Sequence, residues 1–250
     1  GRCGRSAFRQ SRTGAGGSYG GPFAVLARIS ILVGRVGPQN YPLVYLGKVC
    51  DVTSALAVAG AARRDITPSV RVLPLAIAVG LGMFAAWVGI DTWVPYPHLG
   101  ARTGFNPFQS LAGSGWLVPA FLVVRFYGLV LMVPVMEELF MRSFLLRYFT
   151  NPRFRDVPMG AFSAGSFAIV AALSAMSHPE WLVAALASAV YALLLRQSRS
   201  LFAVVVAHAV TNAALKERSY SAVMAATGLL YLAILTAFGT DLVARAILAS

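Results

Sequence analysis

The chain has 250 residues, of which 58% are hydrophobic and only 12% are charged, and its formal net charge is +12 at pH 7. A soluble globular domain carries about twice that charged fraction, so the composition excludes an ordinary soluble domain and indicates an integral membrane protein. The positive charge does not indicate nucleic-acid binding, because no platform of interleaved basic and aromatic residues accompanies it.

The N-terminal part of the chain differs in composition from the rest. Residues 1–22 are rich in Gly, Arg and Ser and are expected to form a disordered basic segment. Residues 23–250 are expected to form a single membrane domain. Its first apolar run, 23–33, is short and contains Arg28. A weak first membrane helix or signal anchor fits this run better than a signal peptide, because no small-residue cleavage site follows it.

The next expected helices are at 41–62, 70–90 and 116–149, and a loop rich in Pro, Gly and aromatic residues at 91–115 precedes the third of them. The stretch 116–149 is too long for one straight membrane span. Pro134 lacks a backbone N–H and should kink or break it, which predicts two helical pieces.

In the rest of the chain, the uncharged runs 157–177 and 219–240 are close to the ~20 residues that span ~30 Å of hydrocarbon. Two shorter runs, 181–195 and 200–215, would span only if they are kinked or sheltered by neighbouring helices. They predict helices near 158–177, 180–196, 200–216 and 221–240. The fold class is therefore all-α, a polytopic membrane bundle of about seven or eight transmembrane helices.

The basic residues fall in alternate loops of this bundle, as the positive-inside rule predicts for loops that remain in the cytoplasm. We therefore expect a cytoplasmic N-terminus, which in a bacterial cell places the protein in the inner membrane. The basic residues of the three loops are Arg63, Arg64 and Arg71; Arg147, Arg153 and Arg155; and Arg196 and Arg199.

Two adjacent acids and an arginine interrupt the apolar run after Pro134. Ionisable side chains are costly in hydrocarbon, so their presence there indicates a function. Glu138 and Arg142 are four residues apart on a helix, with the acid first, which is the favoured order for an ion pair. In a low dielectric each needs the other. Glu137 projects elsewhere and is left free to act as a general base.

Two later motifs complete a candidate site. His178 precedes Pro179, where a helix must end, so its imidazole can face a cavity and, with Glu137, hold and deprotonate a water molecule. His208 and Asn212 share one helix face and suit the stabilisation of an oxyanion. A base, a water-positioning imidazole and oxyanion donors are the groups that amide hydrolysis requires.

A simple serpentine path places these groups at different depths. Glu137 would lie near the basic side of the membrane and His178 near the opposite end of its helix. The site then requires broken or re-entrant helices around Pro134 and Pro179.

Each motif also has another explanation. Intramembrane polar side chains commonly join helices, so a non-catalytic membrane scaffold, an immunity protein or a chaperone-like protein is one alternative. A proton- or cation-coupled transporter, with Glu137 and Glu138 as its ion site, is another. Zinc on Glu137, His178 and His208 is possible. Arg142 would disfavour a nearby dication, however, so hydrolysis without metal or cofactor is expected.

The order and spacing of these motifs resemble the signature of the CPBP family of CAAX prenyl proteases and bacteriocin-processing enzymes, whose known members are the type II, Rce1-like CAAX endopeptidases. The resemblance covers residues from about 115 to 217. It rests on Glu137-Glu138-x-x-x-Arg142, then His178, then His208-x-x-x-Asn212.

The resemblance implies an eight-helix membrane bundle and an intramembrane endopeptidase. Its partners would be the lipid bilayer and a protein or peptide substrate that is membrane-associated, prenylated or sorted. By similarity, Glu137 and His178 would activate the water, and His208 and Asn212 would form the oxyanion site. The second acid and the arginine of the first motif would support them.

The loop at 96–107 also resembles a bacterial subgroup associated with exosortase and PEP-CTERM sorting systems. Two positions depart from the family pattern. Ser174 stands where the second motif usually has Phe, which removes an aromatic wall, and Ser143 stands where Gly usually follows the motif Arg. Neither departure removes a candidate catalytic group.

Overall fold

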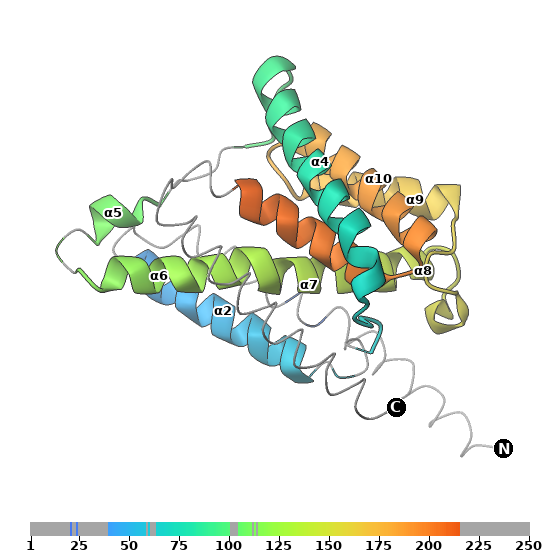
Figure 1. Ribbon diagram of the computed structural model, residues 1–250, viewed down its shortest axis with the longest axis horizontal. Coiled ribbons are helices and arrows are strands. Elements are labelled where there is room, and N and C mark those ends of the chain that lie inside the picture. The colour runs from blue at the N-terminus through green and yellow to red at the C-terminus, as the bar shows by residue number, and fades with distance from the viewer. Residues whose placement is uncertain are drawn as a thin grey trace.

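The computed structural model describes residues 40–58, 64–100, 105–111 and 115–215, together with a few single positions (Figure 1). Every regular element in these ranges is helical, which confirms the all-α fold class. The predicted N-terminal segment at 1–22 and the predicted helices at 23–33 and 221–240 lie outside the described residues.

The first half of the described chain contains two long helices and short turns between them. The elements are α2 (Tyr41–Val58), the 3-10 turn η2 (Val70–Val72), α4 (Leu73–Trp93) and the short α5 (Pro107–Ser110).

The second half begins with one long helix and continues with three shorter ones. The long helix comprises α6 (Leu117–Phe126), η3 (Tyr127–Met132), α7 (Val133–Glu138), η4 (Leu139–Leu145) and α8 (Leu146–Tyr148). After it come the 3-10 turn η5 (Phe154–Asp156), α9 (Ala164–Met176), α10 (Trp181–Ser198) and a last helix, Leu201–Leu215.

The break predicted at Pro134 does not occur, because the chain stays helical from Leu117 to Tyr148. The segments η3 and η4, on either side of α7, are π-helical. In an α-helix the ring of Pro134 would clash with the carbonyl four residues earlier. The wider turns of η3, directly before the proline, relax that spacing. Such π segments are frequent at functional sites, and here they flank Glu137 and Glu138.

Helix α9 begins later than the predicted start near residue 158. Pro158 and Gly160, whose φ is 77°, hold the chain in a turn before it. Ser163 then caps the helix, and its side chain accepts a hydrogen bond from the backbone N–H of Ser166 at 3.4 Å. The helix therefore has 13 residues, about 20 Å of rise, and ends at Met176.

The basic loops meet at one end of the bundle. Arg199 donates a hydrogen bond to the carbonyl of Met159 at 3.3 Å, which joins the end of α10 to the loop before α9. The loop before η2 reaches the same end, because Asp65 forms a 2.6 Å ion pair with Arg147 of α8. Loops that the sequence places on one side of the membrane are thus together in space.

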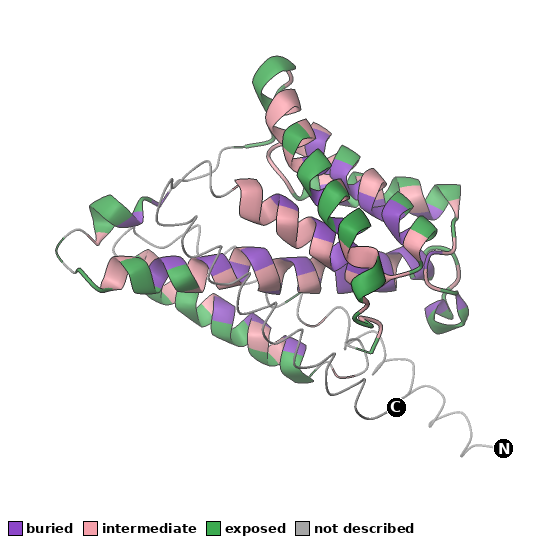
Figure 2. Ribbon diagram, in the orientation of Figure 1, coloured by how far each residue is buried: buried purple, intermediate pink, exposed green. Residues whose placement is uncertain are grey.

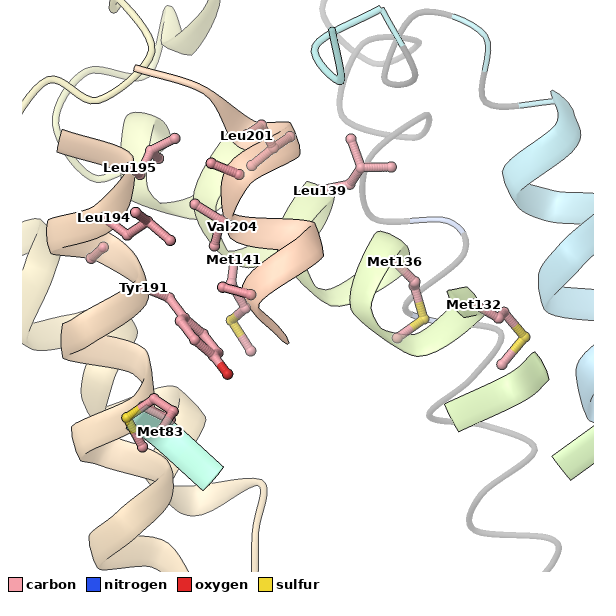
Figure 3. Packing of buried hydrophobic residues seen from close by; sticks show 14 of the residues in the cluster. Met83, Met132, Met136, Leu139, Met141, Tyr191, Leu194, Leu195, Leu201 and Val204 are labelled. Atoms are coloured by element: carbon pink, nitrogen blue, oxygen red, sulfur yellow. The ribbon is translucent and has the colours of Figure 1, made fainter. Parts of the chain in front are cut away.

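The helices pack around a core on the long helix and α10, while much of α4 is exposed (Figure 2). Helix α10 contacts α9 and α4, and α2 contacts α6. Met136 and Leu139 of the long helix are buried, as are Leu201 and Val204 of the last helix (Figure 3).

Three helices in the described part of the chain are long and apolar enough to cross a membrane: Val70–Trp93, Leu117–Tyr148 and Trp181–Ser198. Exposed positions of α4 include Leu75, Ile77 and Leu81. An apolar surface of this kind is stable in lipid and unfavourable in water. The structure supports an integral membrane protein, and the number of seven or eight spans stays a prediction.

Candidate active site

All six side chains singled out from the sequence line one pocket. It offers about 30 Å³ of space for water, and one water molecule needs roughly 10–15 Å³ of such space, so there is room for at least one. The six are Glu137, Glu138, Arg142, His178, His208 and Asn212.

Glu137 and His178 come to similar depths along their helices. Glu137 is eleven residues, about 16 Å of rise, before the end of the long helix at Tyr148. Because α9 is also only about 20 Å long, His178 lies at a comparable distance from the basic end. The predicted difference in depth disappears because α9 is short, and no helix has to break at Pro134.

The predicted pair of Glu138 and Arg142 is present. Arg142 Nε lies 3.1 Å from Glu138 Oε2, and both side chains are almost completely buried, with 4% and 0% exposure. Neither of these two atoms has a hydrogen-bond partner, so this contact is an ion pair only. A second nitrogen, Arg142 Nη2, donates to the carbonyl and to the hydroxyl of Ser188 at 3.3 and 3.2 Å. Helix α10 therefore helps to hold the guanidinium.

Glu138 also binds His208, a contact that the sequence did not predict. His208 Nδ1 lies 2.7 Å from Glu138 Oε1. A carboxylate oxygen accepts, so the proton is assigned to Nδ1. The other ring nitrogen, Nε2, is directed toward Glu137 and lies 4.0 Å from its Oε2. That distance is too long for a direct hydrogen bond.

His178 has a defined tautomer too. Its Nδ1 lies 3.0 Å from the carbonyl oxygen of Ser174, which can only accept, so Nδ1 carries the proton. When the imidazole is neutral, Nε2 has a free lone pair that can accept a proton from water. The ring of Trp87 packs edge-on against His178 with centroids 6.2 Å apart. Helix α4 therefore contributes an aromatic side chain to the pocket beside His178.

Asn212 is fixed by the long helix. Its Nδ2 donates to the carbonyl oxygen of Leu129, in the π-helical η3, at 2.9 Å. One N–H of the amide is used in this bond and a second remains. Asn212 lines the pocket with the two histidines, so the remaining N–H can serve a bound carbonyl.

Sequence reasoning missed several residues of the site. Tyr191 and Thr211 line the pocket and are buried, and their hydroxyls are 2.8 Å apart. Lys48 of α2 does not line the pocket, but its charge interacts with that of Glu137. The spacing of Ser188 and Tyr191 on an otherwise apolar helix could have indicated a shared polar face. The interaction of Lys48 with Glu137 depends on the packing of α2 against the long helix, and the sequence carries no signal of it.

The possible zinc ligands do not form a metal site in this arrangement. Within the residues that the structure describes, no three His, Cys, Asp or Glu side chains are grouped closely enough to hold an ion, and this includes Glu137, His178 and His208.

One comparison with known proteins gives a match. Residues 119–214 match the family described as type II CAAX prenyl endopeptidase Rce1-like. The matched segment contains the long helix from its first turn, α9, α10 and nearly all of the last helix, with all six predicted residues. The comparisons with curated proteins and with solved structures give no match.

Proposed function

We propose that this chain, whose residues 119–214 match the Rce1-like family, is an intramembrane endopeptidase that uses a water molecule as nucleophile. The proposed substrate is a protein at the membrane, either membrane-associated, prenylated or sorted. A CAAX sequence is not required by the geometry, and the exosortase-associated subgroup stays a prediction.

One observation carries this proposal. Glu137 Oε2 and His208 Nε2 face each other at 4.0 Å in a pocket with room for water, and His178 and Asn212 line the same pocket. A base, two imidazoles and an amide donor around one small polar space are the parts that hydrolysis of a peptide bond requires.

The reaction begins with a water molecule in the pocket that Glu137 and His178 both line. Glu137 takes one proton, while His178 Nε2 accepts a hydrogen bond from the other O–H and orients the oxygen lone pair. The oxygen attacks the peptide carbon and the carbonyl becomes an oxyanion. Protonated Glu137 then gives its proton to the leaving nitrogen, the C–N bond breaks, and the carboxylate is restored.

The oxyanion is the group that His208 and Asn212 would stabilise. Asn212 offers its second amide N–H, since the first is bound to Leu129. His208 keeps Nδ1–H on Glu138 and presents Nε2 to the pocket, where Nε2 donates to the oxyanion when it carries a proton. Donors held in place before the reaction cost no reorganisation when the charge develops.

Exchange of the proposed base tests this function. Glu137→Gln keeps the shape of the side chain and removes its basicity, so cleavage of membrane precursors should fall below detection while insertion is unchanged. Proteomic comparison of membranes carrying wild type or variant would detect uncut precursors. Asp156→Asn is the matched control, because Asp156 is an exposed carboxylate in the loop before α9.

A second exchange tests the histidine. His178→Ala should abolish cleavage, whereas His98→Ala, on an exposed loop, should retain it. Full activity of both the Glu137 and the His178 variants would contradict the protease and favour the non-catalytic scaffold. Ion flux into liposomes that Glu137→Gln abolishes, without any cleavage by wild type, would favour the transporter.

A further inference from the structure

Tyr191 of α10 lies between two groups of the proposed site. Its side chain is 3% exposed, and its ring stacks on His208 with centroids 5.3 Å apart and an interplanar angle of 27°. The guanidinium carbon of Arg142 lies 5.7 Å from the centre of the same ring. Figure 3 shows Tyr191 projecting from α10 into the interior of the bundle.

The position of this ring is fixed by a chain of hydrogen bonds across three helices. The Tyr191 hydroxyl donates to Thr211 Oγ1 at 2.8 Å, and Thr211 is 2.9 Å from the carbonyl oxygen of Gly80 and 3.0 Å from that of Ala207. Thr211 has one proton, which it needs for a carbonyl, so its oxygen accepts from the tyrosine. Tyr191 therefore donates to Thr211, and Thr211 donates to a backbone carbonyl.

The far end of this chain cannot shift easily. A Cβ added at Gly80 would lie 2.5 Å from the Ala207 carbonyl oxygen and 2.8 Å from Val210 Cβ. Helix α4 and the last helix are therefore in backbone contact at the place where Thr211 binds. The hydroxyl of Tyr191 is consequently anchored to a rigid junction.

The bond to Glu138 does not by itself fix the orientation of the His208 ring, so a second contact is needed. Its bond to Glu138 holds Nδ1, but the torsion between Cβ and the ring of a histidine is soft, so one bond leaves the ring free to rock. A buried ring stacked on its face limits that rotation. Nε2 then stays directed toward Glu137 and the pocket.

We propose that Tyr191 is a positioning residue of the endopeptidase, which fixes the plane of His208 from one side while Glu138 fixes its tautomer from the other. The same ring, with Ser188 one turn earlier, holds Arg142 and so keeps Glu138 in place. This role rests on the proposed function, but the orientation of His208 can be measured without a substrate.

The chain contains three histidines, so a spectrum of the full chain in lipid nanodiscs with ¹⁵N-labelled histidine has three imidazoles to follow. His98→Ala and His178→Ala assign two of them. In wild type, His208 should show a single set of shifts with Nδ1 protonated. Tyr191→Leu should broaden or shift the His208 signals alone, and Tyr191→Phe, which keeps the ring, should do so less.

Kinetics give the second measurement. Loss of one hydrogen bond in Tyr191→Phe or Thr211→Val should lower kcat about 2- to 10-fold with KM unchanged. Tyr191→Leu should lower kcat by more than about 10-fold, and Tyr191→Phe should recover most of it. A role in folding alone would instead lower the amount of active protein at equal kcat, and that result would overturn the proposal.

Unchanged His208 signals in Tyr191→Leu, or in both Tyr191→Phe and Thr211→Val when the leucine variant fails to fold, would also overturn it. Absence of cleavage by wild type would contradict the endopeptidase. The spectra would still decide whether Tyr191 orients His208.

Discussion

At the scale of single residues, Glu137 and Glu138 are adjacent in the chain and differ completely in surroundings. Glu138 is fully buried and contacts both Arg142 and His208, whereas Glu137 is 20% exposed and faces the pocket. Because consecutive residues on a helix point in different directions, one acid faces the protein interior and the other faces the pocket. This difference in burial is consistent with the proposed roles, in which Glu138 supports the site and Glu137 reacts.

The two acids should therefore respond differently to the same substitution. Glu138→Gln leaves Arg142 buried without a counter-charge, which should cost about 3–5 kcal/mol of stability and most of the activity. Glu137→Gln should abolish activity at little cost in stability. Thermal unfolding in detergent, with cleavage assayed in parallel, measures both, and equal destabilisation by the two variants would contradict this assignment.

Asn212 offers a test of the oxyanion site. Asn212→Ala removes the donor to the transition state, so kcat should fall by about 10²- to 10³-fold while KM changes little. It also removes the bond to the Leu129 carbonyl, which should cost about 1 kcal/mol of stability. Steady-state kinetics on a cleavable reporter measure both constants. A change confined to KM would show that Asn212 serves substrate binding and not the transition state.

At the scale of elements, the site depends on a π-helical segment in the long helix and on the late start of α9, and not on a break in a helix. The long helix stays continuous through Pro134 because η3 precedes it as a π segment, and Leu129 of that segment accepts the bond from Asn212. Helix α9 is short because Gly160 and the Ser163 cap delay its start. The continuous long helix and the short α9 together place Glu137 and His178 at similar distances from the basic end of the bundle.

The contact of α4 with the last helix can be tested at two glycines of the same helix. Gly80→Ala places a methyl group 2.5 Å from the Ala207 carbonyl and should destabilise the protein by about 1–3 kcal/mol. Gly82→Ala meets nothing within 4 Å and should be neutral or stabilising. Thermal unfolding of the two variants gives the comparison, and equal stability would show that the junction is not tightly packed.

At the scale of the whole molecule, the basic loops lie at one end of the bundle, tied together by Asp65 with Arg147 and by Arg199 with Met159. The opposite end contains the loop after α4, where Trp181 donates to the Pro97 carbonyl at 2.8 Å. Basic loops remain in the cytoplasm, so the first end should be cytoplasmic.

Cysteine labelling tests this orientation. With Cys3 and Cys50 replaced by Ser, a cysteine at Arg155 should react with a membrane-impermeant reagent only from the cytoplasmic side. A cysteine at Thr92, at the exposed end of α4, should react only from the other side. The reverse pattern would place the basic loops outside and contradict the predicted topology.

The sequence by itself determined the class of the protein and the identity of the six polar residues, because hydrophobicity and helical spacing are local properties. The pair of Glu138 and Arg142 followed from spacing within one helix. The tertiary structure alone decided that Glu138 also holds His208, that Trp87 packs against His178, and that His178 reaches the depth of Glu137. These features depend on contacts between helices and on where a helix begins. Contacts between helices produce no periodic pattern in the sequence, so the sequence cannot predict them.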